Sequence, residues 1–260
     1  MRRLAALVLC ACAGGTAHAA DAPICADRPA KANAVCTVPA GSVQVETAAV
    51  DWSLTRSPGT RVELLTVGSS YVKLGVSDGS DLEVGFTPHA ALTTRDVSES
   101  KLSGVGDVLL RYKQRLTAAE ARVQVAWIPF VKLPTAGHGL GNGELEGGVV
   151  VPVSFTLSGQ ATMTIGPELD VLADSDGRGR HLALVNVVNV SAPVAPRLTL
   201  SGELWSNVNF QPGGTIKQAS ADAALAYALS KRVQVDVGAN LGLTSATPDA
   251  EGYVGLSIRF

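Results

Sequence analysis

The chain has 260 residues, of which 46% are hydrophobic and only 17% are charged, and its formal net charge is -2. A nearly neutral chain without a cluster of Lys and Arg has no electrostatic basis for binding nucleic acid. Beyond the N-terminus, no stretch approaches the roughly 18 uncharged apolar residues of a membrane-spanning helix. This apolar content therefore predicts either a well-buried soluble core or a sheet that closes into a membrane barrel.

The first twenty residues have the pattern of an export signal. Arg2 and Arg3 supply positive charge, residues 4–12 are apolar, and residues 17–19 form a small-residue cleavage site. We therefore predict a signal peptide over residues 1–20. The alternative is a lipoprotein processing site with Cys12 as the lipidated residue, which would leave a very short apolar region.

Residues 21–41 are rich in Ala and Pro and contain Cys25 and Cys36, the two cysteines that remain after processing. Because an exported chain reaches an oxidising compartment, we predict a disulfide between them. We interpret residues 21–41 as a periplasmic N-terminal segment that precedes the sheet. A metal site is disfavoured, because no Cys-x-x-Cys motif occurs and the histidines of the mature chain lie far away in sequence.

From Ser42 onward, apolar and polar residues alternate with the period of two that a strand requires. In residues 232–243, for example, Val and Leu side chains fall on one face while Gln234, Asp236 and Asn240 fall on the other. Several predicted strands reach or exceed the roughly 9–11 residues of a tilted transmembrane strand. The predicted strands cover residues 42–52, 62–74, 81–90, 105–115, 122–133, 144–155, 161–171, 181–191, 197–209, 219–229, 232–243 and 250–260.

The connections between these strands alternate in length. Outer-membrane barrels have short periplasmic turns and longer external loops, and an even strand number brings both ends of the sheet to the periplasmic side. We therefore predict an all-β fold over residues 42–260, an antiparallel up-and-down transmembrane β-barrel of about twelve strands in the bacterial outer membrane. The longer loops are predicted over residues 53–61, 91–104, 134–143, 172–180, 210–218 and 244–249.

The last strand ends in Phe260 and places Val254, Leu256 and Ile258 on one face and Arg259 on the other. We expect membrane lipid to cover the apolar face, and we expect the barrel-assembly machinery to recognise this terminal strand.

The pleat also predicts a set of charged residues that point into the barrel. Two interpretations remain open: ion pairs fill a closed barrel, or the charges line a narrow aqueous path with a mild preference for cations. The strand number does not decide, because about eight strands give a filled interior and sixteen or more an open channel. The candidates for lining the lumen are Lys73, Glu83, Asp107, Arg111, Lys113, Lys132, Glu144, Glu146, Glu168, Glu203, Asp222, Asp236 and Arg259.

The sequence contains no pattern typical of a catalytic, metal or cofactor site. No Gly-x-Ser-x-Gly motif occurs, and the glycine-rich residues 137–143 lack the spacing of a phosphate loop. A stretch beginning at Asp174 resembles the start of a calcium loop, but Val185 stands where the twelfth-position Glu is required. We therefore predict that the protein is not an enzyme and needs no cofactor.

The sequence resembles a known family in three segments, which are Tyr71–Asp78, Gly104–Lys113 and Ile128–Pro134. They are similar to the transporter-type outer-membrane barrels grouped with the MetA pathway of phenol degradation, and the similarity covers most of the mature chain. The resemblance implies a channel or transporter for small, often aromatic or hydrophobic solutes, without catalytic residues. The alternatives are a closed structural or interaction barrel that acts through its external loops, and a soluble periplasmic β protein.

Overall fold

The computed structural model describes residues 23–260, so the predicted signal peptide and Cys12 lie outside the described residues. Residues 43–259 form one antiparallel sheet of sixteen strands, and one short 3-10 helix, η1 (Ser158–Gln160), joins two of them. In the described part of the chain, no helix is long and apolar enough to cross a membrane.

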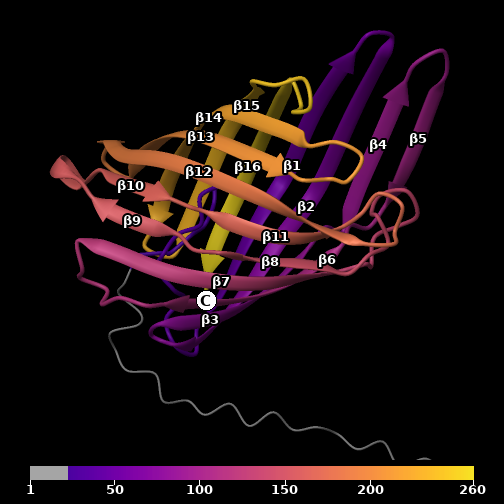
Figure 1. The fold of residues 1–260 in the computed structure, drawn as a ribbon. Coiled ribbons are helices and arrows are strands. Elements are labelled where there is room, and N and C mark those ends of the chain that lie inside the picture. Colours follow the sequence, from indigo (N-terminus) through magenta and orange to yellow (C-terminus); the bar gives the residue numbers. More distant parts are fainter. Residues whose placement is uncertain (1–22) are drawn as a thin grey trace, which may run out of the picture.

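The sheet closes on itself. β1 (Val43–Ser57) pairs on one side with β2 (Thr60–Ser77) and on the other with the last strand, β16 (Ala250–Arg259). Closure removes the free edges of a sheet and lets neighbouring strands satisfy the backbone N–H and C=O groups. Figure 1 shows the resulting barrel, from which the β1–β2 hairpin and strands β4 and β5 extend beyond the other strands.

Twelve spans make up the wall, because four of them are each broken into two short strands. Pro88, Pro152 and Pro167 stand at three of the breaks, and proline has no N–H to donate to a neighbouring strand. The broken spans are β3 (Ser80–Phe86) with β4 (His89–Arg95), β5 (Glu99–Gly104) with β6 (Val108–Arg115), β8 (Glu146–Val150) with β9 (Val153–Thr156), and β10 (Thr162–Ile165) with β11 (Glu168–Ala173). The remaining strands are β7 (Val123–Leu133), β12 (Arg180–Ala195), β13 (Leu198–Asn209), β14 (Ile216–Ser230) and β15 (Val233–Gly242).

The predicted all-β barrel of about twelve spans is confirmed. Two predicted loops are wrong. Residues 91–104 form most of the β4–β5 hairpin, and β1 continues through residues 53–57 to a tight turn before β2. β5 is exposed along almost its whole length, so its sequence lacks the apolar alternation from which the other strands were predicted.

Burial in this barrel is inverted relative to a soluble protein. Gln44, Lys73 and Lys113 are among the most deeply buried side chains, whereas Leu204 and Leu241 are about 60% exposed. Charged residues are almost never fully buried unless they are paired, and large exposed apolar surfaces mark contact with another phase. A polar interior inside an apolar outer surface is the arrangement of a wall with lipid outside, and the fold is that of an outer-membrane barrel.

Candidate functional site: a plugged lumen

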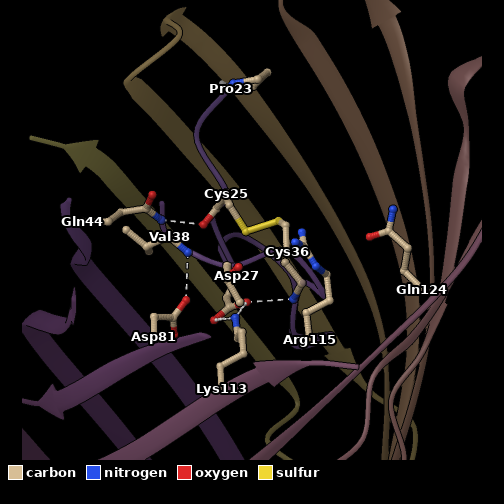
Figure 2. The surroundings of a disulfide bond; sticks show 12 residues. Pro23, Cys25, Asp27, Cys36, Val38, Gln44, Asp81, Lys113, Arg115 and Gln124 are labelled. Atoms are coloured by element: carbon tan, nitrogen blue, oxygen red, sulfur yellow. Dashed lines mark hydrogen bonds and ion pairs between the residues drawn. A yellow bond between two sulfur atoms is a disulfide. The ribbon is translucent and has the colours of Figure 1, made fainter. Parts of the chain in front are cut away.

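Residues 23–41, which we call the plug, fold back against the inner wall instead of standing apart from the sheet. In Figure 1 the indigo stretch before β1 lies within the ring of strands. The predicted disulfide is confirmed: Cys25 and Cys36, with Cα atoms 5.9 Å apart, close the plug into a loop. Figure 2 shows Gln44 of the wall reaching Cys25 in this loop, and Asp81 reaching Val38 just beyond it.

The first anchor of the plug is Asp27, whose carboxylate lies among three cations of β2 and β6. Lys73 Nζ is 2.5 Å from Asp27 Oδ2, and Lys113 Nζ is 2.8 Å from Oδ1. The guanidinium of Arg111 is 3.8 Å away. Burial alone raises the pKa of Asp27, but these positive charges, that of Lys113 foremost, outweigh burial and hold the pKa well below its usual range. Asp27 is therefore ionised and binds the plug electrostatically.

The wall neutralises the same cations from the other side. Glu46 of β1 contacts Lys73 at 2.5 Å, and Glu83 of β3 contacts Arg111 at 3.0 Å and Lys113 at 3.4 Å. The strand register places these charges side by side across the wall, because Lys73 stands opposite Glu83 and Glu83 stands opposite Arg111. An unpaired charge in such a buried position is strongly destabilising. Because positive and negative residues alternate across these strands, each charge has a partner and all of these residues can be buried.

Arg28 provides the second anchor, on the C-terminal strands. Its Nη2 lies 2.7 Å and its Nε 3.3 Å from the two carboxylate oxygens of Asp236 on β15. Its guanidinium also lies 5.4 Å from the ring centre of Tyr253 on β16, which is within the range of a cation–π contact. Gly255 leaves the necessary space, because a Cβ at this position would lie only 2.6 Å from Arg28 Cζ.

Lys31 provides the third anchor, on β13 and β14. Its Nζ lies 2.8 Å from Asp222 Oδ2 and 5.1 Å from the ring centre of Trp205. Glu203 accepts hydrogen bonds from the backbone N–H groups of Lys31 and Ala32, both at 3.0 Å. The carboxylate of Glu203 thus holds the plug backbone while Asp222 holds its side chain.

These anchors lie on eight neighbouring spans of the twelve, so the plug is attached to part of the wall and leaves the remaining spans free of it. The attached strands are β1, β2, β3, β6 and β13 to β16. No hydrogen bond or ion pair found among residues 23–260 joins the plug to the strands from β7 to β12. The other side of the plug faces open space.

A cavity of about 340 Å³ occupies that space at the end of the barrel with the short turns. The wall contributes mainly hydroxyl and amide side chains here, and such groups can exchange hydrogen bonds with a passing solute or with water. The polar wall residues are Gln124, Ser154, Thr156, Thr162, Thr164, Asn189, Ser191, Thr199, Ser201 and Gln234.

A second cavity of about 340 Å³ lies toward the end with the long loops. Asn33 of the plug lines both cavities, and it accepts a hydrogen bond from Arg111. Asn33 therefore lies between the two spaces. The second cavity is lined by Asn33, Tyr71, Leu109, Arg111, Phe130, Lys132, Glu146, Val150, Glu168, Asp170 and Leu172.

The residues predicted to line the lumen fall into separate groups. Six of them contact the plug directly: Lys73, Arg111, Lys113, Glu203, Asp222 and Asp236. Glu83 pairs with Arg111 and Lys113 behind them, and Arg259 donates a hydrogen bond to the carbonyl of Pro23. Lys132 lies 3.2 Å from Asp107 and 2.9 Å from Glu146 beside the second cavity, which Glu168 also lines. Glu144 stands apart, in a partly exposed pair with Arg180.

The sequence analysis missed Asp27, Arg28 and Lys31, on which the plug depends. The sequence pointed to these residues only indirectly. They are three charged residues in an Ala- and Pro-rich segment, and acids outnumber bases among the residues predicted to face the lumen. It also missed the interior aromatics Tyr71, Trp205 and Tyr253, because ring–cation contacts join residues far apart in the chain.

The comparisons with known proteins agree on the barrel. A family model described as the putative MetA-pathway of phenol degradation matches residues 26–260. Among curated proteins, none matches the chain.

Several solved structures share the fold at low sequence identity. An outer membrane channel from Pseudomonas putida F1 is 15% identical with a TM-score of 0.67, covering 89% of this chain and 99% of that chain. The NanC porin is 11% identical with a TM-score of 0.52, covering 83% of this chain and 98% of that chain. The β domain of the Bordetella autotransporter BrkA is 12% identical with a TM-score of 0.52, covering 85% of this chain and 100% of that chain. These likenesses show the fold alone.

Proposed function

The chain belongs to the family described as the putative MetA-pathway of phenol degradation, and from this premise we propose that it is an outer-membrane channel that carries small solutes past its plug. Compact aromatic or hydrophobic compounds are the proposed solutes. Tyr71 and Phe130, beside apolar Leu109 and Leu172 in the second cavity, support this choice.

One observation carries the proposal: the cavity between the unattached side of the plug and the hydroxyl-lined wall. A barrel whose interior served only as a filled core would be packed there, because protein interiors leave few voids larger than a water molecule. The proposed path enters the second cavity from the loop end, passes Asn33, and leaves through the first cavity at the short-turn end.

The contacts that hold the plug also suggest that the plug can move within the barrel. Its anchors are ion pairs and hydrogen bonds to the wall, and Arg28 and Lys31 keep 19% and 31% of their side chains exposed. Ion pairs in contact with water are weak and sensitive to salt. Because no contact found in the described part of the chain joins the plug to the strands from β7 to β12, a shift of this segment widens the path without separating any wall strands.

Single-channel recording in planar bilayers tests the proposal. The Arg28→Ala/Lys31→Ala variant loses the ion pairs with Asp236 and Asp222 but keeps the backbone contacts with Glu203. We expect a larger unitary conductance or a higher open probability than in the wild type. The matched control is Arg61→Ala/Lys101→Ala, which removes two cations from the exposed parts of β2 and β5. Its conductance should equal that of the wild type.

Folding of each variant is checked by heat-modifiable migration on a gel, so that a failure to insert is not mistaken for a closed channel. Absence of conductance steps in folded wild type and in the folded Arg28→Ala/Lys31→Ala variant would contradict the channel. That result would favour the alternative of a closed barrel that acts through its external loops.

A further inference from the structure

The second cavity contains an imbalance of charge. Its two cations already have partners, since Arg111 contacts Glu83 at 3.0 Å and Lys132 contacts Asp107 and Glu146. The acids Glu168 and Asp170 also line this cavity. Within residues 23–260, neither of them forms an ion pair.

Asp170 is the more enclosed of the two acids. Only 8% of the residue is exposed, and within residues 23–260 no N–H group donates to its buried Oδ1 atom. Glu168, two residues earlier on β11, projects from the same side of the strand, and its carboxyl group lies within hydrogen-bond distance of the carboxyl group of Asp170. Two buried carboxylates this close repel each other when both are ionised, so this pair is suited to a positively charged ligand.

An aromatic ring lies beside the same carboxylate. Phe130 on β7, Gly148 on β8 and Asp170 on β11 stand opposite one another in successive strands. A Cβ on Gly148 would clash with Asp170 Oδ1 and would lie 2.9 Å from Phe130 Cζ. The ring and the carboxylate therefore lean over the same glycine, from its two sides.

We propose that Phe130, Glu168 and Asp170 form a binding site for an organic cation, an ammonium group carried on a compact apolar body. The carboxylates neutralise the ammonium charge, and the face of an aromatic ring attracts a cation electrostatically. Leu109 and Leu172 provide apolar surface in the same cavity. This inference rests on the proposed channel function and names the solute class that the path selects.

The size of the cavity limits the ligand. A volume of about 340 Å³ is near the lower end of the range for small-molecule pockets, and a single-ring amine is of suitable size. An aromatic carboxylate of the same size would place its charge against two acids without free cations to receive it. The site therefore distinguishes ligands by the sign of their charge.

Isothermal titration calorimetry on the purified full-length barrel in detergent tests the site. The probes are benzylammonium, benzyl alcohol and benzoate, which share a ring and differ in charge. We expect benzylammonium to bind at least tenfold more tightly than either of the others. The Glu168→Gln/Asp170→Asn variant should lose at least tenfold in benzylammonium affinity.

The matched control is Glu63→Gln/Glu99→Gln, which removes one half-buried and one exposed acid from β2 and β5, neither of them lining the second cavity, and should bind benzylammonium as the wild type does. Phe130→Leu retains both carboxylates and serves as a second variant if the double substitution fails to fold; its preference for benzylammonium over benzyl alcohol should fall. Equal affinities for benzylammonium and benzoate, or unchanged affinity in the Glu168→Gln/Asp170→Asn variant, would overturn the site.

Binding in detergent and conductance in a bilayer separate this inference from the proposed function. A barrel that conducts but shows no preference for benzylammonium contradicts the site and leaves the channel intact. A barrel that binds benzylammonium but never conducts contradicts the channel and leaves the site intact.

Discussion

Among single residues, Asp27 joins the plug to three cations of the wall. The Asp27→Asn substitution removes its carboxylate charge and leaves Lys73 and Lys113 paired with the wall acids alone. Hydrogen bonds to charged groups contribute about 1.5–3 kcal/mol, so we expect a loosened plug and a higher open probability in single-channel recordings. Asp96→Asn, on the exposed β4–β5 turn, is the control and should behave as the wild type does.

The lowered pKa of Asp27 sets the pH range over which it acts. A carboxyl group with a lowered pKa in the folded state stabilises that state fully at pH values above its ordinary pKa. This stabilisation disappears only as the pH falls through the lowered pKa. We therefore expect the difference in open probability between wild type and Asp27→Asn to persist at about pH 4, where an ordinary aspartate is half protonated. Loss of that difference between pH 7 and 5 would contradict the assignment.

Glycine 255 offers a test that leaves every charged residue in place. In the Gly255→Ala variant, the new methyl group meets the guanidinium of Arg28. The flexible arginine can move away, so we expect the barrel to fold but the contact between Arg28 and Asp236 to be lost. The channel should then resemble an Arg28→Ala variant in its conductance.

The matched control lies on the same strand. A Cβ on Gly252 would meet no atom within 4 Å, so Gly252→Ala introduces the same methyl group without touching the plug. An equal change of conductance in the two glycine variants would contradict a specific role for the space at Gly255.

At the level of elements, the two faces of each strand meet different solvents. Val237, at the middle of β15, is 51% exposed and stands beside Leu225 and Val254 on the outer face. A basic residue on a lipid-facing strand costs about 2–4 kcal/mol near the middle of the bilayer. We expect Val237→Arg to lower the yield of heat-modifiable, folded barrel.

The control for this substitution is Val97→Arg, on the fully exposed turn between β4 and β5. The same change of charge at that position should leave the folded yield unchanged. Equal yields from the two variants would contradict the contact of β15 with lipid.

The strands were predictable because period-two alternation is a local property of the chain. The alternation in β15 placed Asp236 and Asn240 on the buried face, where the structure has them. The breaks at Pro88, Pro152 and Pro167 could also have been predicted from the missing proline N–H. The strand β5 could not, because a strand exposed on both faces needs no alternation. Recognition of the last strand by the assembly machinery stays a prediction.

For the whole molecule, the disulfide limits the motion of the plug relative to the barrel. No wall strand contributes a cysteine to it, so Cys25→Ser/Cys36→Ser should leave the temperature of heat-modifiable unfolding unchanged. Removing a cross-link around a loop this short returns somewhat less than about 3 kcal/mol of chain entropy to the open loop. We expect more frequent openings in single-channel recordings, and reductant should have the same effect on the wild type but none on the double variant.

The position of the plug could not have been predicted from the sequence. Asp27 meets Lys113, and Arg28 meets a residue more than two hundred positions away. Alternation of polar and apolar residues indicates which face of a strand points into the lumen, but it does not indicate which segment of the chain occupies the lumen. The predicted inner charges were therefore identified as a set, while their division into plug anchors and cavity lining depends on the fold.

The anchors of the plug also set an order of events in biogenesis. Glu203, Asp222 and Asp236 lie on β13 to β15, whereas Lys73 and Lys113 lie on β2 and β6. These two groups face a common interior only after β1 has joined β16. The plug, although it precedes every strand in the sequence, is therefore the last segment to reach its final position. In a barrel trapped before closure, the plug would still lie outside the lumen.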